Sequence, residues 1–137
     1  KKQKFVGAIH AGWKGAFKGI VKKTIQLLKK NGCSEKDMIA CIGPCIKKNS
    51  YEVKNDFFKL FKDKNKKNVN FFTFKRKKIY FDLSEYIKSQ FYENGVKKID
   101  IIRKDTYALE NNFFSSRRSK KNKHNDYGRN ISAIMIK

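Results

Sequence analysis

The sequence predicts an α/β fold, layered α/β/α with a mixed β-sheet, formed by a single domain over residues 1–137. Short apolar runs alternate with amphipathic segments, glycines stand at many of the boundaries, and one hairpin pattern lies mid-chain. A chain of 137 residues, 39% of them hydrophobic, has enough apolar surface to bury a core. We therefore expect strands and helices that alternate along the chain.

The first half of the chain predicts two strands and a helix between them. Lys4–Ile9 has the apolar and small residues of a close-packed strand. A helix follows over about Ala16–Lys30, with apolar residues at helical spacing and lysines elsewhere, and Asn31-Gly32 ends it. Met38–Ile42 predicts the second strand, and Gly43-Pro44 forces a loop where that strand ends.

The second half begins with a helix that Ser50 caps, followed by a polar loop over Lys62–Asn68. We expect a turn over Phe113–Arg118 and a charged, mobile segment over Ser119–Tyr127. The other predicted elements are the hairpin strands Phe71–Phe74 and Ile79–Phe81, a helix over Leu83–Asn94 closed by Gly95, and strands over Ile99–Ile102 and Ile131–Ile136.

The net charge of +22 raises the question of nucleic-acid binding. The excess is almost all lysine, spread over the whole length, and only five residues are arginine. Direct reading of bases favours arginine, whose planar fork donates two parallel hydrogen bonds. We expect salt-sensitive attraction to polyanions but no specific nucleic-acid partner, and a non-catalytic basic binding domain stays open as an alternative.

Cysteine usage and hydropathy bear on the compartment. The three cysteines, an odd number, favour reduced thiols in a reducing compartment. Cys41 and Cys45 resemble half of a metal site, but no second half follows. No apolar run approaches the roughly 18 residues of a membrane span, so we expect no membrane association and a cytoplasmic location. Because the sequence begins with Lys1 rather than Met, we also expect a missing upstream segment.

Three polar segments follow predicted strands. They are His10-Ala11-Gly12-Trp13, Gly43-Pro44-Cys45, and Asp105-Thr106, which leads to Arg117-Arg118. Ligands of α/β folds bind at the carboxyl ends of strands, so we expect a site where these segments meet.

Three ordered motifs resemble signatures of the laccase-domain, or YfiH-like, family of purine nucleoside phosphorylases. They are His10–Gly15, then Ile42–Ile46 with Tyr51-Glu52-Val53, then Phe113–Arg118 with Gly128-Arg129. Their order and approximate spacing match the family. The resemblance covers the whole chain but only the C-terminal half of the family's domain, so we expect that the N-terminal part is absent from this chain.

The resemblance implies a glycosyl transfer: zinc-dependent phosphorolysis of purine nucleosides (adenosine, inosine, guanosine and methylthioadenosine), with phosphate as the nucleophile. It also implies adenosine deamination through metal-activated water as a related activity. The family binds zinc through a His and a Cys from an upstream pattern and a third His that matches His10. The first two ligands have no counterpart here, and Cys41 and Cys45 do not match the family's ligand Cys. One ligand cannot hold the ion, so a protein beginning near Lys1 would bind little zinc.

The resemblance and the needs of an anionic substrate together select the candidate residues. His10 and Arg117 are the catalytic candidates, and His10 is the metal candidate. Cationic side chains, a hydroxyl and close backbone approach at glycine suit phosphate and nucleoside binding. The substrate-binding candidates are accordingly Gly12, Lys14, Gly43, Ser115, Arg118 and Arg129.

Several roles stay open at this point. Trp13 stacks on a base or packs in the core, with packing favoured. For Cys45 the alternatives are a buried thiol and a nucleophile, and the buried thiol is favoured. Asp105 stands at a position where relatives often carry Cys. For Glu52 and Asp82 the alternatives are catalysis as an acid or base and an ordinary role as a solvated or helix-capping residue. Copper-dependent polyphenol oxidation is an alternative activity, with copper in place of zinc, but it needs more histidines than His10 and His124. A degenerate domain that has kept only the fold is another alternative.

Overall fold

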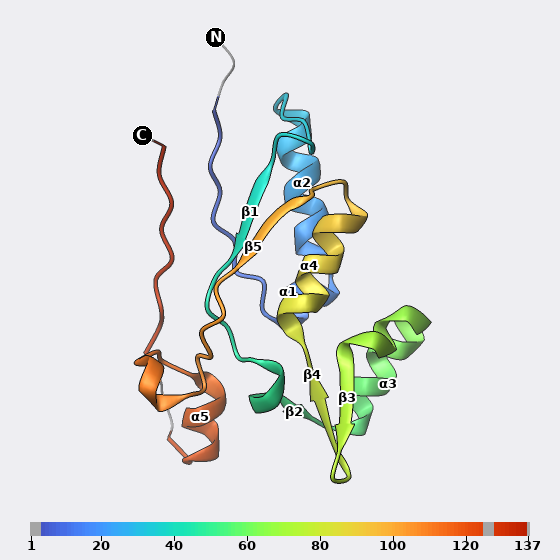
Figure 1. The fold of residues 1–137 in the computed structure, drawn as a ribbon, viewed down its shortest axis with the longest axis vertical. Coiled ribbons are helices and arrows are strands. Elements are labelled where there is room, and N and C mark those ends of the chain that lie inside the picture. Colours follow the sequence, from blue (N-terminus) through green and yellow to red (C-terminus); the bar gives the residue numbers. More distant parts are fainter. Residues whose placement is uncertain (1–3, 125–127, 137) are drawn as a thin grey trace.

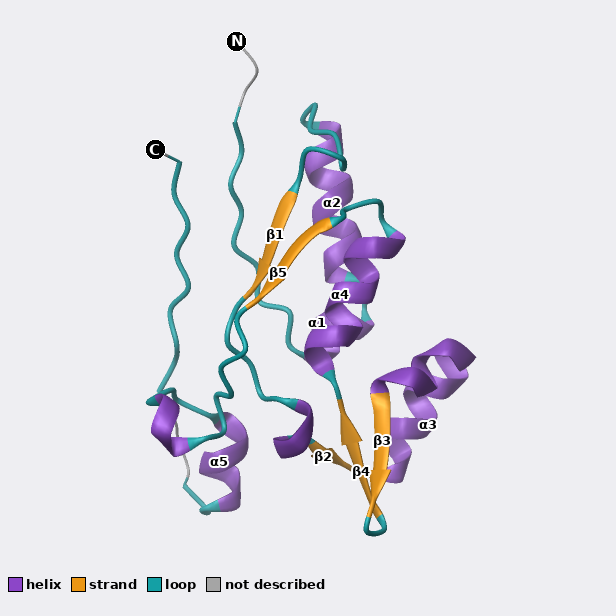
Figure 2. Ribbon diagram, viewed as in Figure 1, coloured by secondary structure: helices purple, strands orange, loops and turns teal. Residues whose placement is uncertain are grey.

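A computed structural model describes residues 4–124 and 128–136. Figures 1 and 2 show helices on one side of the long strands and a separate hairpin sheet. In chain order the helices and strands are α1 (Trp13–Phe17), α2 (Ile20–Lys30), β1 (Ile39–Ile42), β2 (Glu52–Val53), α3 (Asn55–Lys64), β3 (Phe72–Lys75), β4 (Lys78–Phe81), α4 (Leu83–Glu93), β5 (Lys98–Ile101) and α5 (Ser116–Lys121). Short 3₁₀ helices occupy Lys48–Ser50, Lys66–Phe71 and Leu109–Asn111.

The strands form two sheets. β1 pairs with β5 in parallel, from Ile39 opposite Lys98 to Ile42 opposite Ile101. β2, β4 and β3 form an antiparallel sheet in that order. The predicted α/β class and the mixture of parallel and antiparallel pairing are confirmed, and the two kinds of pairing lie in different sheets.

Two packed units share one core. Around the hairpin, Phe61 and Phe81 are completely buried, with ring centroids 4.8 Å apart. Around the parallel sheet, α2 and α4 pack against each other and supply buried residues such as Val21 and Ile87. In β1, Ile42 is 7% exposed and Ile39 is 78% exposed, because alternate strand residues point to opposite faces. The helices therefore cover one face of β1 and β5. Among the residues described, no helix is long and apolar enough to cross a membrane.

The predicted helix over Ala16–Lys30 is two helices. α1 ends at Phe17, and Gly19 adopts a φ of 80°, a conformation that glycine reaches without strain. The predicted end at Asn31-Gly32 is confirmed, with Asn31 as the C-cap and Gly32 at a φ of 83°. The glycine in the middle of the segment therefore makes α1 a separate short unit after the His10 turn.

The prediction that Ser50 caps a helix is wrong. The Ser50 hydroxyl instead donates to Asp105, and the helix begins at Asn55 after the short strand β2. The predicted loop over Lys62–Asn68 is also wrong, because α3 continues to Lys64 and a 3₁₀ helix follows. Asn68 is buried, and its amide donates to the Phe61 carbonyl at 2.8 Å. A tertiary contact thus orders a segment whose polar composition favours a loop.

The hairpin, the helix over Leu83–Asn94 and the strand over Ile99–Ile102 are confirmed to within a residue or two. The helix end also has the expected glycine, since Gly95 adopts a φ of 87°. Asp82 caps α4 by accepting from the backbone N–H of Glu85 at 3.1 Å, which favours its capping role over acid–base chemistry.

Two predicted strands, Lys4–Ile9 and Ile131–Ile136, do not form in the described structure. Both segments are extended, but neither is assigned to a sheet with another described segment. The predicted turn over Phe113–Arg118 runs into helix α5, so Ser119 is buried in a helix and not in a mobile segment. Residues 125–127 of the predicted mobile segment lie outside the described residues.

Candidate functional site

The parallel pairing of β1 and β5 brings two of the predicted site loops together. Beyond the strands, the Ile102 N–H donates to the Ile42 carbonyl at 2.9 Å. The Thr106 N–H then donates to the Cys45 carbonyl at 3.2 Å, where Cys45 and Asp105 form an isolated parallel bridge. The segments after β1 and after β5 therefore lie side by side, as expected for strand ends at one edge of a sheet.

Asp105 accepts three hydrogen bonds, and two of them join these loops. Its carboxylate accepts from the Ser50 hydroxyl at 2.6 Å and from the backbone N–H of Lys47 at 3.2 Å. The N–H of Tyr107 donates to it at 2.9 Å. This role of Asp105 was not predicted from the sequence. Asp at a turn often accepts a hydrogen bond from the backbone N–H two residues further on, as Asp105 does from Tyr107. This local tendency is the signal in the sequence that could have indicated its role.

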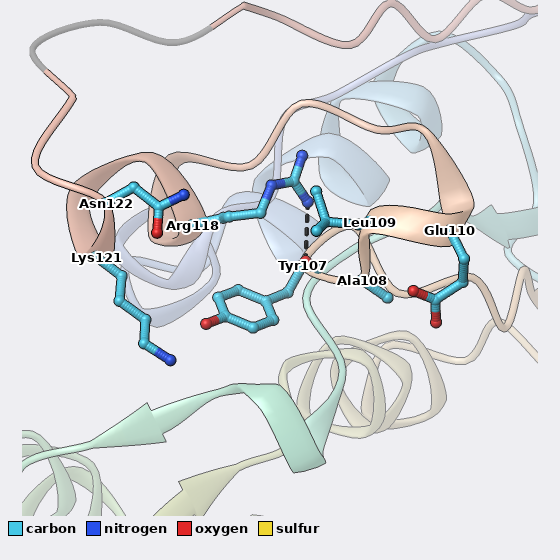
Figure 3. A pocket seen from close by; sticks show the side chains of 7 residues that line it. All are labelled: Tyr107, Ala108, Leu109, Glu110, Arg118, Lys121 and Asn122. Atoms are coloured by element: carbon cyan, nitrogen blue, oxygen red, sulfur yellow. Dashed lines mark hydrogen bonds between the residues drawn. The ribbon is translucent and has the colours of Figure 1, made fainter.

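Arg118 lies against the loop after β5, beside an open cavity of about 300 Å³ (Figure 3). Its guanidinium donates to the carbonyls of Thr106 at 3.1 Å, Tyr107 at 2.8 Å and Phe113 at 2.5 Å. These bonds occupy N–H groups that could otherwise donate to a phosphate. The geometry therefore favours a role for Arg118 in stabilising the loop. Substrate binding by Arg118 remains a prediction.

Arg117 is exposed and differently placed. Its guanidinium carbon lies 5.1 Å from the ring centroid of Tyr51, and one N–H donates to the Glu52 carbonyl at 3.2 Å. Burial raises the pKa of the Tyr51 phenol, and the adjacent Arg117 charge opposes part of that rise. Arg117 therefore keeps further N–H donors at the surface, above an aromatic ring that fixes its position.

A chain of aromatic contacts joins Arg117 to the turn that follows His10. Tyr51 lies 6.3 Å from Phe57, and Phe57 lies 5.0 Å from Trp13, between ring centroids. Trp13 thus packs into the core, the favoured alternative for this residue.

His10 is exposed at the end of the extended N-terminal segment. A Cβ atom at Gly12 would lie 2.8 Å from the Nε2 atom of His10, so the imidazole rests on the glycine. Gly12 also starts α1, because its carbonyl accepts from the Ala16 N–H at 2.9 Å. Only a residue without a side chain leaves the ring in this position. Lys14 is exposed on α1, with its Nζ 5.6 Å from the centroid of Trp13.

The remaining predicted residues are spread around this region. No atom of the described residues lies within 4 Å of a Cβ built at Gly43, which leaves open space beside its backbone. Ser115 is buried, and its hydroxyl oxygen caps α5 by accepting from the Arg118 N–H at 3.3 Å. Arg129 is exposed next to Asn130, whose amide is bonded to Phe114. Their substrate contacts stay predictions.

Metal-ligating residues do not gather in the described structure. No group of three or more His, Cys, Asp or Glu that could hold a metal ion occurs within residues 4–124 and 128–136. Cys45 is half-buried, and burial raises the pKa of its thiol, which disfavours the thiolate that binds metals. The described residues therefore offer His10 as one candidate ligand but do not complete a zinc site.

Comparison with known proteins identifies the family. A family model described as multi-copper polyphenol oxidoreductase laccase matches residues 1–137. The chain belongs to this laccase family. Members similar to it include a purine nucleoside phosphorylase of Rickettsia conorii, 38% identical over 137 residues, with 98% of this chain and 56% of that protein covered. One from Aquifex aeolicus is 38% identical over 104 residues, covering 76% of this chain and 46% of that protein.

A solved structure supports the same fold for this member of the laccase family. The hypothetical protein YfiH of Bacillus licheniformis superposes with a TM-score of 0.71 at 26% identity, covering 81% of this chain and 43% of that chain. The chain thus spans about half the length of the relatives that it matches. The family description names copper, whereas the relatives are named for purine nucleoside phosphorolysis.

Proposed function

We propose that this chain is part of a purine nucleoside phosphorylase that transfers the ribosyl group of a purine nucleoside to phosphate. The observation that carries the proposal is the similarity to purine nucleoside phosphorylases along almost the whole chain. The geometry adds support, because the loops after β1 and β5, the Arg117 region and the His10 turn are connected through hydrogen bonds and the aromatic core.

In this proposal, phosphate binds beside Arg117. A guanidinium with free N–H donors binds phosphate through two parallel hydrogen bonds, and the Tyr51 ring limits the orientations that Arg117 can take. Lys14 and Arg129, both exposed, are the other cationic residues that we propose for binding the anion. The purine nucleoside would contact backbone at Gly12 and Gly43, where the missing side chains allow close approach.

We propose zinc as the cofactor, with His10 as one of its ligands. The residues described here do not complete such a site, so the other ligands must come from polypeptide outside them. Zinc bound to His10 would supply electrostatic stabilisation next to the reacting nucleoside. This chain would then contribute His10, whose imidazole lies over Gly12.

The test uses the complete protein, in which this chain is joined to the rest of the domain. Phosphate-dependent release of purine base and ribose-1-phosphate from adenosine and inosine is the expected result. Absence of base release from the zinc-loaded complete protein would refute the phosphorylase proposal. Conversion of adenosine to inosine without phosphate is measured in parallel, since it reports the related deaminase activity separately.

Arg117→Ala tests the phosphate site, with Arg103→Ala as the matched control, because both residues are exposed arginines. We expect Arg117→Ala to raise the KM for phosphate at least roughly tenfold, the loss of a charge-assisted pair of hydrogen bonds. Arg103→Ala should leave that KM near its original value. Equal effects of the two substitutions would show that general positive charge, and not the Arg117 site, binds phosphate.

A further inference from the structure

The turn between β3 and β4 carries four consecutive cations. Lys75 and Lys78 stand opposite each other at the ends of the two strands, and Arg76 and Lys77 form the turn itself. All four residues are exposed. Figure 1 shows this turn at the lower end of the molecule, where it projects past α3. We call residues 75–78 the hairpin tip.

The conformation of the hairpin tip is unfavourable in two ways. Arg76 and Lys77 adopt φ values of 48° and 61°, a left-handed conformation in which residues with a Cβ atom are strained. Lys75 and Lys78 place like charges on directly opposed strand residues, where they repel each other. Backbone strain of this kind is concentrated at functional sites. The hairpin tip therefore has the character of a site that requires concentrated positive charge.

Little of this charge is neutralised within the chain. The carboxylate of Glu52 lies 2.8 Å from the Nζ atom of Lys78, and no other ion pair between described residues involves the tip. Residues 54–78, from the N-cap of α3 through the tip, contain ten basic and two acidic residues, a net charge of +8 out of +22. Less than a fifth of the chain thus carries more than a third of its net charge.

An exposed aromatic ring stands beside the tip. Phe74 precedes Lys75 and is 59% exposed, whereas Phe72, on the same face of β3, is 8% exposed. The ring of Phe74 lies 5.2 Å from that of Phe58 on α3, between centroids, at an angle of 84°. This contact fixes the ring and leaves more than half of the residue accessible. Aromatic rings next to cations bind unpaired bases, which stack on the ring while the phosphates meet the cations.

We propose that the hairpin tip and Phe74 bind single-stranded nucleic acid without reading its sequence. Phosphate groups contact the cations of the tip, and a base stacks on Phe74. Lys62, one turn after Phe58 on α3, extends the positive surface. Lysine binds phosphate as a point charge and does not select bases, so the attraction is to the backbone. This binding is independent of the proposed phosphorolysis, because none of these residues belongs to the candidate site.

The arrangement favours nucleic acid over an anionic membrane. A segment that enters a bilayer places its apolar side chains foremost, with cations behind them. In the hairpin tip the foremost residues are Arg76 and Lys77, and the ring of Phe74 lies behind them against Phe58. Anionic vesicles therefore serve as the competing partner in the test.

Fluorescence anisotropy of the complete protein with a labelled, mixed-sequence RNA oligonucleotide of about 15 nucleotides tests the proposal. The tip variant is Arg76→Asn, Lys77→Gly, which removes two cations and relieves the strained turn, so it should fold at least as stably as the parent. It should bind the oligonucleotide at least about tenfold more weakly. The slope of log affinity against log salt should decrease in magnitude by about 1.4, which corresponds to two lost phosphate contacts.

Phe74→Leu separates stacking from charge. Leucine keeps an apolar side chain against Phe58 but has no aromatic face, so the affinity should fall at least about fivefold while the salt slope stays unchanged. The double substitution Lys22→Gln, Lys23→Gln on α2 is the matched control, because it removes an adjacent pair of exposed cations from another surface. The control should leave the affinity within about twofold of the parent value.

Three results would overturn the proposal. Equal losses in the control and in the tip variant would show that the net charge of the whole protein, and not the hairpin tip, binds the oligonucleotide. Unchanged binding by the tip variant or by Phe74→Leu would exclude the site. Tip-dependent sedimentation with vesicles of phosphatidylcholine and phosphatidylserine, without binding of the oligonucleotide, would identify an anionic membrane as the partner instead.

Discussion

The hydroxyl of Ser50 donates to the carboxylate of Asp105 at 2.6 Å, across the gap between the loops that follow β1 and β5. The same carboxylate accepts from the backbone N–H groups of Lys47 and Tyr107. The bonds from Ser50 and Lys47 join loops that are far apart in sequence, and the bond from Tyr107 lies within the second loop. Asp105 is thus the residue on which the relative placement of the two loops depends most directly.

Asp105→Ala should lower the free energy of unfolding by about 2–3 kcal/mol, because it leaves three partly buried donors without their acceptor. Urea unfolding followed by far-ultraviolet circular dichroism measures this value. Asp63→Ala, at an exposed position of α3, is the control and should change stability by less than about 0.5 kcal/mol. Equal losses in both variants would show that Asp105 does not organise the loops.

Substitutions of the adjacent Arg117 and Arg118 should differ in their effect on stability. Arg118→Ala removes the bonds to three carbonyls and should lower the free energy of unfolding by about 2 kcal/mol. Arg117→Ala removes an exposed hydrogen bond to the Glu52 carbonyl and the contacts of the guanidinium with Tyr51, so its cost should stay below about 1 kcal/mol. Thermal and urea unfolding of the two variants test the order, and a larger cost at Arg117 would contradict it.

Gly12→Ala should move the imidazole of His10. The new Cβ would lie 2.8 Å from Nε2, and since His10 is exposed its ring is free to turn away. We expect a changed pattern of NOEs between the ring and residue 12, with a stability change below about 1 kcal/mol. Gly7→Ala is the control, because no atom lies within 4 Å of a Cβ there. Unchanged ring NOEs in Gly12→Ala would show that the ring does not rest on this glycine.

Alkaline pH should destabilise the chain through buried acidic groups. Burial raises the pKa of the Cys45 thiol and of the Tyr51 phenol, so both keep their protons to higher pH in the folded chain than in the unfolded chain. Stability is therefore complete below the unfolded thiol pKa, about 8.5, and falls as the pH rises above it. The free energy of unfolding, measured in urea at about pH 8 and about pH 10, should be lower at the higher pH.

Cys45→Ala should reduce the loss of unfolding free energy at alkaline pH. Cys41→Ala is the matched control and should leave that loss unchanged, because Cys41 is exposed. Alkylation by iodoacetamide gives a second readout, because Cys41 is exposed and should react before Cys45. Mass spectrometry of peptides from partly alkylated protein measures the order. Faster labelling at Cys45 would show that its thiol is more accessible than that of Cys41, contrary to the structure.

The hairpin turn between β3 and β4 offers a stabilising substitution. Arg76 and Lys77 adopt φ values of 48° and 61°, the positive pair that is characteristic of type I′ turns. Asn and Gly populate this region with less strain, so the double substitution Arg76→Asn, Lys77→Gly should raise the free energy of unfolding by about 1 kcal/mol. Urea unfolding checks the gain, and a loss of stability would show that the turn is not of this type.

The sequence predicts best those elements that are defined by local signals. Gly32 and Gly95 end helices where expected, and the hairpin follows from two short apolar runs. Ser50 shows the limit of such signals, because its hydroxyl has two uses and the competing partner, Asp105, is 55 residues away. Sequence periodicity contains no information about that choice.

In the candidate site, too, some features could be predicted from the sequence and others depend on tertiary contacts. The strand ends after β1 and β5 were expected to meet, and they do. The different surroundings of Arg117 and Arg118 were not foreseeable, since adjacent residues of the same type diverge only once α5 sets their directions. Lys4–Ile9 and Ile131–Ile136 were predicted as strands from their apolar sequence, but neither segment pairs with another described segment, because composition alone does not specify a pairing partner.

The register of β1 against β5 has a consequence for the order of folding. Residues 39–42 must find residues 98–101, which closes a long loop, whereas β3 and β4 meet across a two-residue turn. Closing a long loop costs more chain entropy and slows the step. We therefore expect the hairpin and α3 to collapse first, and the loops that carry Cys45 and Asp105 to become ordered only in the slow final phase of folding.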